Sequence, residues 1–182
     1  MRRRTTIATS LTALSLAALS ACAPATSSGG SCDDFTSYMP TATTPPSFAT
    51  DLYPLFSDTN ETVNGCGQTT ICHGAPPMTL DPAMTKTLVF TTSAASAKAA
   101  LLENSVNAPN MKRVVPGNVG ASFLAYKIAK DRSGLACVNS MCVAGASVGN
   151  NAPCGDLMPN LGELTDAQRT KILDWIALGA AD

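Results

Sequence analysis

The sequence predicts a small, mostly α domain whose long loops are stapled by disulfides, and three observations lead to this fold class. The chain has 182 residues, 45% of them hydrophobic and 14% charged, which suits one ordinary domain with tails. Apolar residues recur at helical spacing in several segments, most regularly near the C-terminus. Seven cysteines and 13 glycines are spread through the chain, and loops as long as those between the segments need something besides packing to organise them.

The N-terminus predicts an exported lipoprotein. Three arginines at positions 2–4 precede an apolar stretch at 7–21, which is too short to span a membrane and has the length of a secretory hydrophobic region. The stretch ends in Leu-Ser-Ala-Cys, which resembles the lipobox of bacterial lipoproteins. The resemblance implies a signal peptide over 1–21 and acylation of Cys22, which would anchor the protein in a lipid membrane facing the periplasm or the cell surface. The alternative is an ordinary signal peptide with an incidental cysteine.

Residues 22–46 predict a flexible tether between lipid and domain. The segment is rich in Ser, Thr, Pro and Gly and cannot bury enough apolar surface to order itself. It is held in place only if Cys32 is bridged. The folded domain is therefore expected over 47–182.

Export also decides how the other cysteines are interpreted, because thiols oxidise outside the cytosol. They become candidates for disulfides or for covalent cofactor attachment. The single His excludes a site that needs two imidazoles, and a net charge of -1 gives no electrostatic case for binding nucleic acid. The six cysteines are Cys32, Cys66, Cys72, Cys137, Cys142 and Cys154.

The first helix of the domain is expected at 47–56, where Phe48, Leu52 and Phe56 fall on one face. Pro54 is tolerated only near the first turn of a helix, so this pattern leaves the boundary open.

The middle of the chain alternates between loops and helices. Residues 57–92 are predicted to be loops, because glycines and prolines punctuate them. A short apolar run at 88–90 is expected to be extended. An Ala-rich helix is expected at 93–102 and an amphipathic helix at 121–130. Residues 134–156, rich in cysteine and glycine, are expected to form a stapled loop.

The C-terminal helix has the clearest signals. Thr165 and Gln168 form the pattern of a capping box. Gly179 stands where a helix ends in the left-handed conformation. The expected buried stripe consists of Ile172, Leu173 and Ile176, with Trp175 beside it.

The single histidine directly follows a cysteine, in Cys72-His73-Gly74. This is the second half of the C-x-x-C-H motif, in which two thiols add to c-type haem and the adjacent imidazole reaches the iron. Met158, just ahead of the C-terminal helix, offers a thioether for the opposite axial position, and Met78 and Met111 are its rivals. A His/Met pair raises the reduction potential and leaves no open position for substrate.

In this order the motifs resemble a class I cytochrome c domain, especially those of exported bacterial lipoproteins. The resemblance spans roughly 48–180. It implies a cytochrome c-like fold, covalent haem c and one-electron transfer with a redox partner protein, with His73 and Met158 as axial ligands of the haem iron. The residues that carry it are Asp51-Leu52-Tyr53-Pro54-Leu55-Phe56, Cys72-His73-Gly74, Val115-Pro116-Gly117 with Ser122-Phe123-Leu124, and Met158-Pro159 before the last helix.

One spacing departs from the family motif. The first thiol of C-x-x-C-H would stand at Thr69, and the nearest upstream cysteine is Cys66, giving C-x5-C-H. Three helical residues rise about 4.5 Å, whereas six rise about 9 Å and leave the thiols on different faces. A bulged loop brings Cys66 and Cys72 either to one haem edge as thioethers or to each other as a disulfide.

Two functions therefore stay open. The first is a lipid-anchored c-type haem protein that carries electrons and is not an enzyme, with haem thioethers on Cys66 and Cys72. The alternative is a haem-free lipoprotein of the same fold, held by three disulfides and acting as a structural or binding module. In both, Cys137, Cys142 and Cys154 are expected to staple the 134–156 loop, with or without Cys32, in a pairing that the sequence does not give. Lys112 and Arg113 are expected to be solvated charges, or else partners of haem propionates.

Overall fold

The computed structural model describes residues 34–57, 88–90, 92–131, 133–143, 154–159 and 163–182. This part of the chain is 44% helix and contains no strand. Its one β-bridge is isolated and joins Asn104 to Lys112. The predicted mostly α class therefore holds for the described residues.

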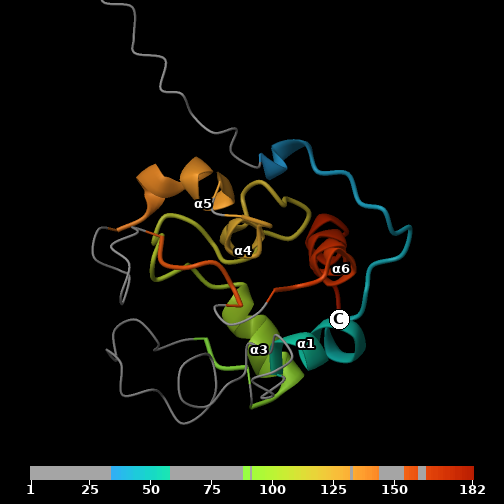
Figure 1. Ribbon diagram of the computed structural model, residues 1–182. Helices are drawn as coiled ribbons and strands as arrows, with labels where there is room; N and C mark the ends of the chain where they lie inside the picture. The colour runs from blue at the N-terminus through green and yellow to red at the C-terminus, as the bar shows by residue number, and fades with distance from the viewer. Residues whose placement is uncertain (1–33, 58–87, 91, 132, 144–153, 160–162) are drawn as a thin grey trace, which may run out of the picture.

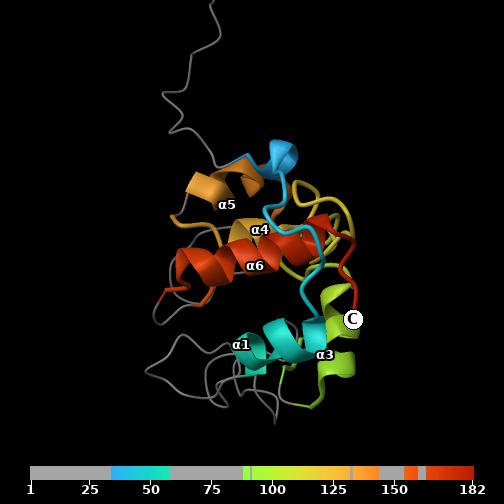
Figure 2. The same ribbon diagram turned by 90° about the vertical axis from the view of Figure 1, so that its right-hand side faces the viewer.

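The helices lie in three tiers, which are clearest when the molecule is seen from the side (Figure 2). The upper tier holds η1 and α5, the middle tier α4 and α6, and the lower tier η2, α1 and α3 (Figures 1 and 2). Their bounds are η1 Phe35–Ser37, η2 Phe48–Leu52, α1 Tyr53–Ser57, α3 Ala94–Leu101, α4 Phe123–Lys127, α5 Ser133–Cys137, η3 Asn139–Met141 and α6 Asp166–Ala177.

The helix expected at 47–56 is present as η2 followed without a break by α1. Ser47 caps it by accepting a hydrogen bond from the backbone N–H of Thr50. η2 is a π-helix, in which the Tyr53 N–H reaches back to the carbonyl of Phe48. Pro54 follows one residue later and has no N–H to donate. The change from the wider turn to the α-helix thus occurs next to the proline, which is where helices commonly deform.

Two further helices differ in how well the sequence predicted their lengths. α3 covers Ala94–Leu101 of the helix expected at 93–102, and Ser93 is its N-cap. α4 was expected over 121–130 but ends at Lys127. The carbonyl of Ile128 accepts a hydrogen bond from Nε of Arg169 on α6, at 2.7 Å. This contact between distant residues holds the carbonyl outside the helix, and no local pattern encodes it.

The region expected to be a stapled loop contains helical turns in its described part. α5 and η3 together cover most of 133–141, and the chain is extended at Cys142. By contrast, 88–90 is irregular and forms no strand. Short cysteine- and glycine-rich stretches carry weak local preferences, so packing decides their conformation.

α6 follows the prediction closely. Both hydrogen bonds of the capping box between Thr165 and Gln168 are present. Gly179 has φ of 102° and ends the helix in the left-handed region that favours glycine. The predicted stripe and Trp175 are buried.

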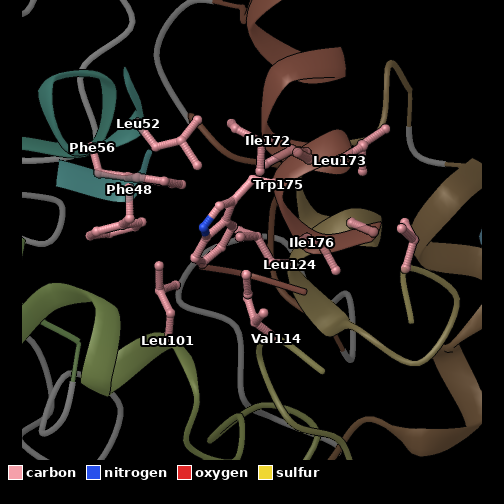
Figure 3. Close-up of a cluster of buried hydrophobic side chains, with 14 of the residues drawn as sticks. Phe48, Leu52, Phe56, Leu101, Val114, Leu124, Ile172, Leu173, Trp175 and Ile176 are labelled. Atoms are coloured by element: carbon pink, nitrogen blue, oxygen red, sulfur yellow. The ribbon is translucent and has the colours of Figure 1, made fainter. Parts of the chain in front are cut away.

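The main core fills the space between the lower and middle tiers. Figure 3 shows the Trp175 ring of α6 pointing between η2 and α3, toward Leu101 and Phe48. Aromatic rings continue from there, with centroids 5.1 Å apart for Phe48 and Trp175 and 6.0 Å for Phe48 and Phe56. The buried members are Phe48, Leu52, Phe56, Phe90, Ala97, Leu101, Val114, Val119, Leu124, Ala125, Ile128, Leu164, Ile172, Leu173, Trp175, Ile176 and Ala180.

A second, smaller group of buried side chains lies on the other side of α4, and we call it the small core. Phe35 of η1 packs against both cores. Phe123 and Tyr126 of α4 belong to the small core, whereas Leu124 and Ala125 belong to the main core, so this short helix separates the two. The small core consists of Ala108, Met111, Phe123, Tyr126, Leu135, Val138 and Cys154.

Residues 34–46, which the sequence assigns to the tether, lie against the helical body. The side chain of Asp174 on α6 is only 3% exposed and accepts four hydrogen bonds from this segment. Its donors are the Tyr38 hydroxyl (2.7 Å), the Thr41 N–H (3.0 Å) and hydroxyl (2.7 Å), and the Ala42 N–H (2.9 Å). A buried carboxylate on a helix far along the chain thus orders a segment that has too few apolar residues to order itself.

Candidate functional site

Most of the expected haem-binding residues lie outside the described part of the chain. Cys66, Cys72 and His73 all fall within 58–87, as does the rival ligand Met78. Cys22 and Cys32 precede residue 34 and are also outside it. The expected attachment of haem through Cys66 and Cys72, and the ligation by His73, therefore remain predictions.

The two ends of the segment that carries His73 are described, and they meet in the main core. Phe56 of α1 and Phe90 are both buried, with ring centroids 4.9 Å apart. Through Phe56 and Phe48 this pair continues to Trp175 of α6. The described chain thus stops after α1 and resumes at residue 88, and both places lie next to the aromatic rings of the main core.

Met158, the expected second axial ligand, lies in the described segment 154–159 and is half-buried. Its backbone N–H donates to the carbonyl of Lys127 at the end of α4, at 2.7 Å. Its neighbour Leu157 packs against the small core, but among the described residues Met158 belongs to neither core. Its thioether is a soft, neutral donor of the kind that binds haem iron.

The rival Met111 has a different environment. Its side chain is 7% exposed and forms part of the small core with Phe123 and Tyr126. The packing of Met111 therefore already uses its side chain, whereas the described contacts of Met158 are made by its backbone.

Lys127 holds the segment before Met158 in place. Its ammonium is buried, and Nζ donates to the carbonyl of Cys154 at 3.1 Å and to that of Asp156. Nζ also lies 5.9 Å from the centroid of the Phe123 ring. A buried ammonium needs hydrogen-bond acceptors in place of water, and these carbonyls supply two of them. The sequence offers one signal for this role, because Lys127 lies four residues after Phe123 on an otherwise apolar helix.

The turn at Gly155 depends on the same lysine. Gly155 has φ of 73°, and a Cβ added there would stand 3.1 Å from Nδ2 of Asn107 and 3.4 Å from Nζ of Lys127. Nδ2 of Asn107 also donates to the carbonyl of Cys154, at 3.4 Å. Glycine thus permits both the conformation and the close approach of two donors.

A disulfide closes this region covalently. Cys142 and Cys154 are joined, with Cα atoms 5.2 Å apart and a sequence separation of 12. Cys154 is buried in the small core. Cys137 is also disulfide-bonded, and its partner lies outside the described residues. The structure thus brings together two of the cysteines expected to staple the loop and places a third in another bond.

The two basic residues considered for haem propionates differ in exposure. Lys112 is exposed, as expected of a solvated charge. Arg113 is only 8% exposed, and its Nη1 donates to the carbonyl of Ala100 at 2.8 Å. Burial lowers the pKa of Arg113, and the Glu103 carboxylate opposes that shift. The expectation of a solvated charge is therefore wrong for Arg113, because its contacts inside the fold take it out of water.

A metal-binding cluster and a membrane-spanning helix are both absent from the described ranges. No three His, Cys, Asp or Glu side chains gather there in a way that could hold a metal ion. None of the helices described has the length and apolar character needed to cross a membrane.

The chain matches no protein-family model, and comparisons with curated proteins and with solved structures found no match.

Proposed function

We propose that this chain is a lipid-anchored c-type haem protein that carries single electrons, with His73 and Met158 as axial ligands. The observation that carries the proposal is the order of the motifs: a helix, then Cys72-His73-Gly74, then Met158-Pro159 directly before the last helix. The contacts of Met158 support it, because the backbone is held while the thioether belongs to neither core of the described residues.

The donor set fits a low-spin haem. Imidazole and thioether are neutral ligands whose combination raises the reduction potential, and two thiols provide covalent attachment. When bound, the haem supplies the redox couple, in which the iron gains or loses one electron. His73 and Met158 would bind the iron, and Cys66 and Cys72 would hold the porphyrin as thioethers.

The chain's own residues would limit how far the ligand moves. Lys127 and the disulfide at Cys154 hold the segment that leads to Met158. A ligand on a fixed backbone needs little rearrangement when the iron changes charge, which suits electron transfer. This arrangement also gives no reason to expect a substrate position on the iron, so we propose a carrier and not an enzyme.

The second candidate is a haem-free module with the same helical body. The observation that favours it is Thr69 at the position of the missing motif cysteine. In that protein Cys66 and Cys72 would be joined to each other, in addition to the bonds of Cys137 and of Cys142 with Cys154. The chain would then carry three disulfides and would act by binding a partner.

Expression of the full chain in an exporting host with a c-type haem maturation system separates the two candidates. A haem stain after denaturing electrophoresis, with a reduced-minus-oxidised spectrum, is expected to show covalent low-spin haem. We expect His73→Ala to lose the haem, and Met158→Ala to keep it but with a lower reduction potential. Met39→Ala is the matched control, because Met39 is 79% exposed. An oxidised, folded chain without haem would support the disulfide module instead.

The membrane anchor is proposed on the lipobox resemblance and is tested separately. Acylation at Cys22 should move the mature chain into the detergent phase of a Triton X-114 extraction. Cys22→Ser should stay in the aqueous phase with its spectrum unchanged. If the unaltered chain is also found in the aqueous phase, the anchor is absent.

A further inference from the structure

The disulfide between Cys142 and Cys154 joins one sulfur near the surface to one in the interior. Cys154 is 2% exposed and belongs to the small core, whereas Cys142 is only half-buried. Both chain neighbours of Cys142 are exposed, Met141 to 49% and Val143 to 41%. A thiolate from solvent can therefore attack Sγ of Cys142 but not that of Cys154, which makes Cys154 the leaving group of such an attack.

The backbone around the two cysteines is held together without the sulfur bridge. Asn107 contacts both sides: its carbonyl accepts a hydrogen bond from the Val143 N–H at 2.9 Å, and its Nδ2 donates to the carbonyl of Cys154 at 3.4 Å. Nζ of Lys127 donates to the same carbonyl at 3.1 Å. Because these contacts do not depend on the bond, the two cysteines stay next to each other when it opens, and the same bond can form again.

Both sulfur atoms also have a backbone acceptor for the hydrogen that each gains on reduction. Sγ of Cys142 lies 3.5 Å from the carbonyl oxygen of Val138. Sγ of Cys154 lies 3.8 Å from the same oxygen and 3.9 Å from that of Leu135. A thiol is a weak hydrogen-bond donor, and contacts of this length suit an S–H group. The buried thiol of Cys154 would therefore have a partner in the reduced form.

Lys127 favours the opening of the bond. Its ammonium donates to the carbonyl of Cys154, so its positive charge lies beside the residue whose sulfur leaves. Lys127 is 8% exposed, and a charge acts more strongly where water is largely excluded. A nearby lysine stabilises a thiolate, and a more stable leaving thiolate makes thiol–disulfide exchange faster.

We propose that Cys142 and Cys154 form a reversible redox site that exchanges two electrons with dithiols. One thiolate of the dithiol attacks Sγ of Cys142, which breaks the bond to Cys154 and forms a mixed disulfide on Cys142. Cys154 leaves as a thiolate and takes up a proton from water. The second thiolate of the dithiol then attacks its own partner sulfur in the mixed disulfide, and Cys142 leaves and is protonated. The dithiol loses two protons and two electrons and becomes a disulfide, so the reaction needs no haem.

Reduction of the folded full chain with dithiothreitol, followed by acid quenching, alkylation and cleavage with cyanogen bromide, tests the site. Cleavage at Met141 and Met158 releases 142–158, whose only cysteines are Cys142 and Cys154. Without denaturant, we expect this fragment to gain two alkyl groups at least about tenfold faster than the chain unfolds. Oxidised dithiothreitol should then restore the bond within the same fragment. A bond that opens only as fast as the chain unfolds would overturn the proposal.

A double variant tests whether the fold tolerates the open bond. Cys142→Ser with Cys154→Ser never contains the bond, and we expect it to keep the helical far-UV circular dichroism of the unaltered chain. Its single variants should differ: Cys142 in Cys154→Ser should react readily with a maleimide, whereas Cys154 in Cys142→Ser should be protected by its burial. Loss of the helical signal in the double variant would show a purely structural disulfide and overturn the proposal.

Two lysine variants separate a role in exchange from a structural role. Lys127→Met should slow the reduction by dithiothreitol about tenfold, because the leaving thiolate loses the nearby positive charge. Lys130→Met, at an exposed position, should leave the rate unchanged. A rate in Lys127→Met that equals or exceeds the rate of the unaltered chain would reject the part of the proposal that concerns Lys127.

Discussion

The main core and the small core are stabilised in different ways. The main core joins η2, α1, α3, α4 and α6 through 17 buried apolar residues, with Trp175 at its centre. The small core has seven buried members, and its surroundings include a disulfide and a buried lysine. Apolar area buried from water stabilises the first. The second buries little apolar area and relies on covalent and polar contacts.

The contrast bears on the proposed function, because the segments that carry the two expected axial ligands adjoin different cores. The segment with His73 begins and ends in the main core, whereas Met158 follows Leu157, which packs against the small core. An electron carrier needs both axial ligands held in fixed positions. The polar contacts of Lys127 and the bond of Cys154 thus provide on one side the rigidity that aromatic packing provides on the other.

Removal of Trp175 should have the largest effect on the main core. Its side chain is fully buried and its Nε1 donates to the carbonyl of Ala181, at 2.7 Å. We expect Trp175→Ala to lower the free energy of unfolding by about 4 kcal/mol, because it removes apolar contacts and leaves a cavity. Urea titration followed by far-UV circular dichroism measures it. In Met39→Ala the change should stay within about 0.5 kcal/mol, and an equal loss in both variants would contradict the central place of Trp175.

Replacement of Asp174 should cause the next largest loss of stability, and the size of that loss should depend on pH. Burial alone would raise the pKa of Asp174, but hydrogen bonds from Tyr38, Thr41 and Ala42 outweigh it and hold the pKa below its ordinary value. Because the folded pKa is depressed, the ionised carboxylate stabilises the fold at neutral pH. That contribution is lost as the pH falls below about 4, toward the folded pKa.

We expect Asp174→Asn to cost about 3 kcal/mol at neutral pH, since an amide cannot accept from all these donors. The variant should also lose less stability than the unaltered chain between about pH 5 and pH 3. Urea titrations at several pH values measure both quantities. Asp182→Asn is the control, because that carboxylate is exposed and pairs only with the Lys98 ammonium among the described contacts. Parallel pH profiles of Asp174→Asn and the unaltered chain would reject the role of Asp174.

Replacement of Lys127 should cause a smaller loss of stability, but it should also loosen the backbone at Met158. Lys127→Met keeps a side chain of similar length and removes the donor to the carbonyls of Cys154 and Asp156, at a cost of about 2 kcal/mol. In the haem protein we also expect a lower reduction potential, because the Met158 backbone is held less firmly. Lys130→Met, at an exposed position, is the control. If both variants have the same potential, Lys127 does not position the ligand.

Local patterns predicted the helices well where a helix carries its own signals. The capping box at Thr165 and the stop at Gly179 gave α6 correctly, and the Ala-rich pattern at 93–102 gave α3. The length of α4 was predicted too long, because its end depends on Arg169, a residue 41 positions away. Nothing in the composition of residues 34–46 indicated order, since their partner is Asp174.

The candidate site was predicted only in part. The sequence singled out Met158 and the cysteines by residue type and spacing, and the structure pairs Cys142 with Cys154. The sequence could not indicate that Arg113 is buried or that Lys127 positions the 154–156 segment. The contributions of Cys66, Cys72 and His73 remain predictions, because these residues lie outside the described ranges.

Information contained in neighbouring residues was sufficient for the helical class, the capping box and the C-terminal end of α6, and the buried stripe around Trp175. Those features depend on side-chain periodicity and on backbone groups within one or two turns. Only the folded structure decided the division into two cores, the end of α4, the packing of residues 34–46 against α6 and the pairing of Cys142 with Cys154. Each depends on a contact between side chains or carbonyls that the fold brings together from distant parts of the chain, and a local pattern cannot encode such a contact.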